Sequence, residues 1–174
     1  MTNYSTGRRA LPGRKSRRQR QISAVKYLIL AAIIAYIVLL LLFTSGSTKS
    51  FSKVQHSVES VLDTEVLIET DVQGLKRYYG LNSADYDGVM LYISEASMSA
   101  EEVLLIKVRT EEQVQKVRAA VEKRLENRKN DFSGYAPKQA QLIEQAQLSV
   151  RGKYIFLAVS SEAEQYKEAF SKSL

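Results

Sequence analysis

Residues 88–109 read GVMLYISEASMSAEEVLLIKVR, and this stretch decides the fold. It holds two short apolar runs, Gly88 to Ser94 and Glu102 to Arg109, separated by the loop Glu95 to Ala100. Short apolar runs bounded by polar or small residues are typical of β-strands. The stretch therefore predicts two strands that follow one another in the chain.

A second pair of strands is predicted near the C-terminus. Leu148 to Val150 and Tyr154 to Ser160 flank a short connection around Gly152, which favours a β-hairpin. The runs Val89 to Ile93 and Tyr154 to Val159 are apolar at nearly every position, whereas a sheet with one solvated face usually alternates apolar and polar residues. Both sheet faces therefore need cover, and we hypothesise that part of one face or edge near Tyr135 stays exposed for a partner.

Helical patterns surround these strands. Apolar residues from Phe51 to Leu62 recur at helical spacing, and a short helix from Val72 to Tyr79 should stop at Gly80. Three further helices are predicted: one from a capping box of Thr110 and Gln113 to about Lys129, one that begins at Pro137, and one from a capping box of Ser161 and Glu164. This order predicts an α+β domain with a largely antiparallel sheet of about four strands and helices on one face.

An uncharged apolar run, Tyr27 to Phe43, precedes this domain. Seventeen residues make about 26 Å of helix, and residues 27–48 carry no charge, so a single transmembrane helix can cross a core of about 30 Å. Eight basic residues and no acidic one precede the run, so the N-terminus is expected in the cytoplasm and the C-terminal domain outside. The expected parts are a basic tail (1–26), an anchor with linker (27–49) and an extracytoplasmic domain (50–174).

Three alternatives concern these first residues. A cleaved signal peptide would have a shorter apolar region, and Thr44-Ser45-Gly46 is a poor cleavage site. Arg17-Arg18 suits a twin-arginine export signal, but the apolar residues that should follow are missing. The basic tail could bind nucleic acid, but orientation of the helix and contact with membrane lipid explain the same charges with fewer assumptions.

Cysteine and histidine are almost absent from the chain, whereas carboxylates are plentiful and could supply an acid and a base, although no spacing singles out a pair. The chain has no cysteine, which excludes thiolate chemistry and a lipidated cysteine anchor, and His56 is the only histidine. We predict no catalytic, cofactor-binding or metal-binding residue. Ser50-Phe51-Ser52-Lys53 has the S-x-x-K spacing of penicillin-binding enzymes, but the partner motifs S-D-N and K-T-G are missing.

The region from Ser50 to Leu174 resembles the clostridial domain of unknown function 4358. The resemblance rests on the order and spacing of short motifs: Tyr79-Gly80-Leu81, Asp85-Tyr86-Asp87-Gly88, the strand Glu102 to Lys107, the turn Gly134 to Ala140, and Gly152-Lys153-Tyr154. It implies attachment to the outer face of the membrane of a Gram-positive bacterium, often as a lipoprotein, and it implies no catalytic residue. Because this chain lacks the lipoprotein cysteine, the resemblance implies a helical anchor instead.

Tyrosines are the remaining candidates for a binding site. Tyrosine combines apolar area with a polar tip, which suits binding surfaces and core edges alike. Tyr135 is the first candidate because Gly134 and Pro137 shape a turn that could present its ring, and Tyr79 and Tyr86 are further candidates. We expect a noncatalytic binding or accessory domain at the bacterial cell envelope, with an envelope protein or polysaccharide as partner. The alternative is an enzyme, or an essential enzyme subunit, that acts on envelope polysaccharide.

Overall fold

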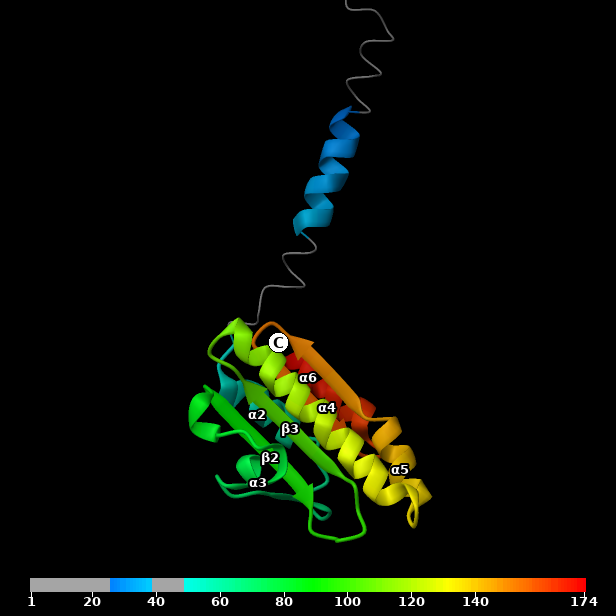
Figure 1. Ribbon diagram of the computed structural model, residues 1–174. Coiled ribbons are helices and arrows are strands. Elements are labelled where there is room, and N and C mark those ends of the chain that lie inside the picture. Colours follow the sequence, from blue (N-terminus) through cyan, green and yellow to red (C-terminus); the bar gives the residue numbers. More distant parts are fainter. Residues whose placement is uncertain (1–25, 39–48) are drawn as a thin grey trace, which may run out of the picture. The chain divides into compact units, whose positions relative to one another are not determined.

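The computed structural model describes residues 26–38 and 49–174. The chain divides into two compact units, Met1–Leu42 and Phe43–Leu174. In the first unit, residues 26–38 form a helix (Figure 1), whereas residues 1–25 of the basic tail and residues 39–43 of the predicted span lie outside the described residues. Among residues 26–38 and 49–174, no helix is both long and apolar enough to cross a membrane.

The second unit contains a five-stranded antiparallel sheet (Figure 1) with the order β1-β2-β3-β5-β4. Its strands are β1 (Leu67–Glu69), β2 (Gly88–Ser94), β3 (Glu102–Lys107), β4 (Gln147–Arg151) and β5 (Tyr154–Val159). The predicted α+β class is confirmed, and so are the four predicted strands. β1 is an additional strand of only three residues.

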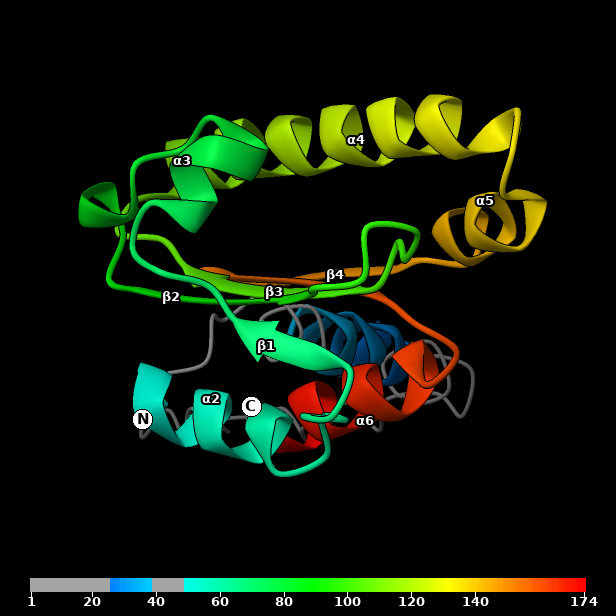
Figure 2. The same ribbon diagram turned by 90° about the horizontal axis from the view of Figure 1, so that it is seen from below.

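Helices cover both faces of the sheet, so the prediction of helices on one face is wrong. Figure 2 shows one layer above the sheet and a second layer below it. The first layer holds α3 (Gly74–Tyr79), α4 (Glu111–Ser133) and α5 (Pro137–Glu144), and the second holds α2 (Phe51–Glu59) and α6 (Ala163–Ser173). A 3₁₀-helix, η1 (Ser83–Asp85), precedes β2.

Two hydrophobic cores explain the continuous apolar strands. In β3, Leu104 and Ile106 pack in the core beneath α4, whereas Val103 and Leu105 pack in the core with α2 and α6. Successive side chains of a strand point to opposite faces, so each residue of such a strand is buried in one core or the other. Strands β3 and β5 are almost fully buried, so the hypothesis of an exposed sheet face is wrong for these central strands.

Local signals set several element ends. The capping box of Thr110 and Gln113 is present, and α4 continues to Ser133, beyond the predicted end. Gly80 ends α3 with φ 67°. The predicted capping box of Ser161 and Glu164 is wrong: α6 begins after Glu162, whose backbone N–H donates to the Ser160 hydroxyl at 3.2 Å.

The first described residues of this unit, Lys49 and Phe51, are held by the central strands of the sheet. The Lys49 carbonyl accepts hydrogen bonds from the Tyr154 hydroxyl at 2.9 Å and from Lys107 Nζ at 3.0 Å. The ring of Phe51 lies against Gly88, where an added Cβ would come within 2.3 Å of the ring. The chain is therefore held by β2, β3 and β5 as soon as it enters the domain.

Candidate functional site

The candidate site lies along β1, the strand at one end of the sheet. β1 pairs only with β2, and the Thr70 N–H donates to the Leu91 carbonyl at 2.9 Å. In an antiparallel pair, residues alternate between those that bond to the partner strand and those whose N–H and C=O point away. The backbone groups of Glu69 therefore point away from β2, and no strand of the described residues pairs with them. We call residues 66–72 the β1 edge.

Apolar side chains are exposed on the β1 edge. Leu67 points into the core and is 2% exposed, whereas Ile68 is 42% exposed and lies opposite Ile93 of β2. Val72, just beyond the strand, is 77% exposed. Exposed apolar side chains beside unpaired backbone groups can serve as a surface for an interaction.

Two hollows adjoin the β1 edge. The larger, of about 300 Å³, has Ile68, Tyr78 and Ile93 as apolar lining and Glu69, Asp71, Glu95 and Arg77 as charged lining. The smaller, of about 120 Å³, is lined by Val72 together with Leu75 of α3 and Val89 and Leu91 of β2. Both hollows can therefore receive apolar side chains next to the strand.

The β1 edge carries negative charge. From Glu59 to Leu75 the chain has five carboxylates and no lysine or arginine. The Tyr92 hydroxyl donates to Glu59 at 3.4 Å, and burial, followed by the charges of Glu59 and Glu69, raises the pKa of Tyr92 to about 12. Burial is the main cause of this raised pKa, and the carboxylates of Glu59 and Glu69 add to it.

A buried ion pair lies on the same side of the sheet as α3, away from the β1 edge. Arg124 donates to the carboxylate of Glu102 at 2.8 and 3.1 Å, and its guanidinium lies 4.9 Å from the ring centre of Tyr78. Burial lowers the pKa of Arg124, but the charge and hydrogen bonds of Glu102 outweigh this effect and leave the pKa above its usual value. Glu102 lines neither hollow of the β1 edge, so the pair joins β3 to α4 and contributes to the fold.

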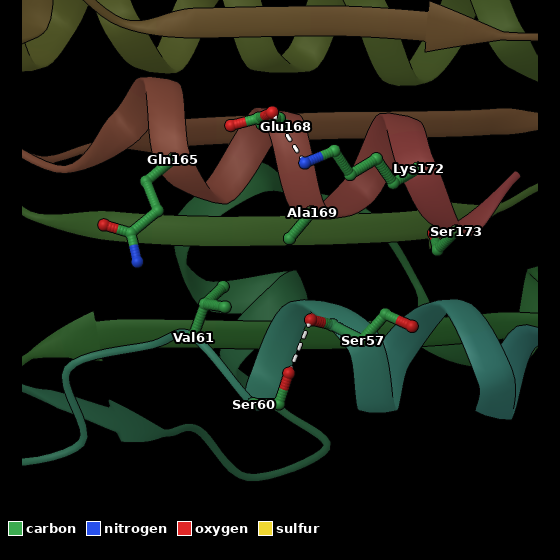
Figure 3. A pocket seen from close by; sticks show the side chains of 8 residues that line it. All are labelled: Ser57, Ser60, Val61, Gln165, Glu168, Ala169, Lys172 and Ser173. Carbon is green, nitrogen blue, oxygen red and sulfur yellow. Dashed lines mark hydrogen bonds and ion pairs between the residues drawn. The ribbon is translucent and has the colours of Figure 1, made fainter.

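A third hollow, of about 410 Å³, lies between α2 and α6 (Figure 3). Most of its lining side chains are short or polar: Ser57 of α2, Ser60 just after α2, and Lys172 and Glu168 of α6, which form an ion pair of 2.7 Å. The side chains that line it include no aromatic residue. It offers less apolar area to a partner than the β1 edge.

The structure does not bring the three candidate tyrosines together. Tyr135 is 58% exposed on the turn after α4, and its ring centre lies 5.7 Å from that of Phe132. Tyr86 lies near the start of α4, since its carbonyl accepts from Arg109. α4 has 23 residues and is therefore about 35 Å long, which separates the two tyrosines.

Tyr79 and Tyr86 are core residues, only 7% and 4% exposed. Within the described part of the chain, neither hydroxyl has a hydrogen-bond partner. Burial, followed by the charge of Glu102, raises the pKa of Tyr79 well above its usual value, and burial, followed by Asp85, raises the pKa of Tyr86. Neither ring can reach a partner without movement of the core, whereas Tyr135 can.

Sequence reasoning missed the β1 edge. The signal that could have revealed a strand there is the short apolar run Val66-Leu67-Ile68, which interrupts the acidic segment after α2. Tyr78 and Ile93, which line the larger hollow, come into reach of β1 only through the fold.

Searches of curated proteins and of solved structures found no match to this chain. The family model described as Domain of unknown function (DUF4358) matches residues 40–160, which is 121 of the 174 residues. The match covers all five strands and the helices between them, and it stops just before α6. The chain belongs to the DUF4358 family.

Proposed function

We propose that this chain is a noncatalytic binding or accessory domain that acts at the bacterial cell envelope. The N-terminal apolar run tethers it to the cell membrane, with the basic tail in the cytoplasm and the domain outside. The observation that carries the binding role is the β1 edge, where exposed apolar side chains, two hollows and unpaired backbone groups occur together. The partner is an envelope protein or polymer.

A second candidate function is an enzyme, or an enzyme subunit, that acts on envelope polysaccharide. Glu69, Asp71 and Glu95 all line the larger hollow, and paired carboxylates are the usual groups for glycoside hydrolysis. All three residues are exposed, however, and a general acid that works near neutral pH usually needs burial or a close like charge to retain its proton. The exposure of these carboxylates favours binding over catalysis.

The proposed location can be tested with protease added to intact protoplasts. Cleavage should remove residues beyond Thr48 and leave an N-terminal tag on the basic tail intact. Complete protection of the C-terminal domain, while a known external protein is digested, would contradict the proposed location.

The binding role can be tested by crosslinking and affinity capture of the full-length chain from membranes. Ile68→Lys should abolish capture of specific partners because it places a charge on the exposed apolar patch. Val150→Lys is the matched control, since Val150 is similarly exposed, at 37%, but lies on the opposite edge strand, β4. Equal capture by both variants and the wild-type chain would refute the role of the β1 edge.

The enzymatic candidate predicts a different result. Purified wild-type chain should release soluble fragments from isolated envelope polysaccharide, and Glu95→Gln should abolish the release. If the wild-type chain releases nothing while it still captures partners, the binding function stands and the enzymatic one is excluded for that polysaccharide.

A further inference from the structure

We infer that the β1 edge binds an extended, basic peptide segment of a partner protein, which adds to the sheet as a sixth strand. This inference rests on the proposed binding function and specifies the class of partner. It also specifies the mode of binding, which combines main-chain hydrogen bonds, apolar contacts in the two hollows and charge attraction.

The backbone of β1 supports the addition of a strand. The groups of Glu69 that point away from β2 are one N–H donor and one C=O acceptor, the pair that an added strand uses. Edge strands that escape such pairing are commonly very short, carry charged side chains or proline, or lie under a covering element. The β1 strand, Leu67-Ile68-Glu69, is short and carries Glu69, but it has neither lysine nor proline, so a basic segment would meet an opposite charge there.

The side chains next to β1 support alternating apolar residues in the added strand. Side chains of a strand alternate between the two faces of a sheet, so every second residue of the added segment would face the α3 side. On that side, Ile68 and Ile93 line one hollow, and Val72 and Leu75 line the other. In this mode of recognition the main chain gives affinity, and pockets for alternate side chains give specificity.

Charge identifies the partner as basic. Five carboxylates occur from Glu59 to Leu75, and Arg77 is the only basic residue among the side chains that line either hollow. A segment with lysine or arginine at the remaining positions would complement these carboxylates, and charge complementarity contributes to both association rate and specificity.

A second copy of the chain matches the edge less well. Pairing of β1 with β1 would place Glu69 and its neighbouring carboxylates close to those of the other copy, and like charges across a pair of strands are destabilising. In a pairing of β1 with the other edge strand, β4, Arg151 is the only charged residue of β4, so that strand offers a single positive charge to the carboxylates. A basic segment of another protein is therefore the occupant that the charges favour.

The test uses the full-length chain in mild detergent and a short fluorescent peptide in which lysine and valine alternate. Binding is measured by fluorescence polarisation, and amide protection is measured by hydrogen–deuterium exchange. The control peptides replace lysine by glutamate or carry N-methyl groups on alternate residues. We expect the lysine peptide to bind at least about tenfold more tightly than either control and to protect residues 65–71.

Two substitutions of one residue separate backbone pairing from charge. Glu69→Pro removes an N–H that points away from β2, so the β1–β2 ladder stays intact, and proline is tolerated on edge strands. This substitution should lower the affinity for the lysine peptide at least about tenfold. Glu69→Lys keeps the N–H and should shift the preference toward the glutamate peptide. Thermal unfolding of each variant shows whether the fold is retained, and if Glu69→Pro is not folded, Glu69→Lys decides alone.

Each remaining outcome contradicts a particular statement. Strand addition is refuted if both substitutions leave the affinity for the lysine peptide unchanged. It is also refuted if the peptide protects amides outside residues 65–71. Neither result contradicts the proposed binding function. Failure of every peptide to bind also refutes strand addition. If Ile68→Lys nevertheless abolishes partner capture, the β1 edge is still the binding surface. A self-associated species in sedimentation that Glu69→Pro dissociates would show that the occupant is a second copy.

Discussion

Removal of Arg124 should destabilise the domain far more than its position near the surface of α4 suggests. The side chain of Glu102 is only 2% exposed, and that of Arg124 is 13% exposed. Arg124→Met keeps the apolar stem but leaves the carboxylate of Glu102 buried without its cation. Loss of one partner of a buried pair costs about 3–5 kcal/mol, and we expect about 3 kcal/mol because water still reaches Arg124.

A double variant tests this reasoning. Glu102→Leu with Arg124→Met removes both charges, so its free energy of unfolding should lie within about 2 kcal/mol of the wild-type value. The assay is urea unfolding of the full-length chain in one detergent, followed by tyrosine fluorescence because the chain has no tryptophan. If Arg124→Met costs less than about 1 kcal/mol, or if the double variant costs the sum of Arg124→Met and Glu102→Leu measured separately, the buried charge of Glu102 is not what Arg124 compensates.

Three further predictions concern single residues. Tyr135→Ala should lower the free energy of unfolding by no more than about 1 kcal/mol because the ring is exposed, and a loss of several kcal/mol in urea unfolding would place the ring in the core. Gly80→Ala should cost about 1–2 kcal/mol, since φ is 67° and nothing lies within 4 Å of an added Cβ; an unchanged melting temperature would contradict this. Tyr92 has a pKa of about 12 in the folded chain against 10.0 ordinarily, so its contribution to stability is complete below pH 10 and is lost as pH rises toward 12. Tyr92→Phe should make the unfolding free energy fall less steeply over that interval, and an identical slope would contradict the assignment.

The sequence predicted four strands because each contains an apolar run bounded by turn residues. β1 was missed because three residues give no periodic signal, and its pairing with β2 depends on a register that only the fold sets. The placement of α2 and α6 opposite α4 was also beyond the sequence, since one apolar stripe does not show which sheet face a helix covers. Exposure of Tyr135 agrees with the predicted turn, but Tyr79 and Tyr86 could not be separated from it, because core and surface tyrosines look alike in sequence.

The attachment of Lys49 has a mechanical consequence. Its carbonyl is held by Lys107 at the end of β3 and by Tyr154 at the start of β5, two adjacent strands of the sheet. A pulling force applied to the chain before residue 49 would therefore reach these strands before it could unwind α2. Tension on the N-terminal side is therefore transmitted to these two central strands for as long as the two hydrogen bonds hold.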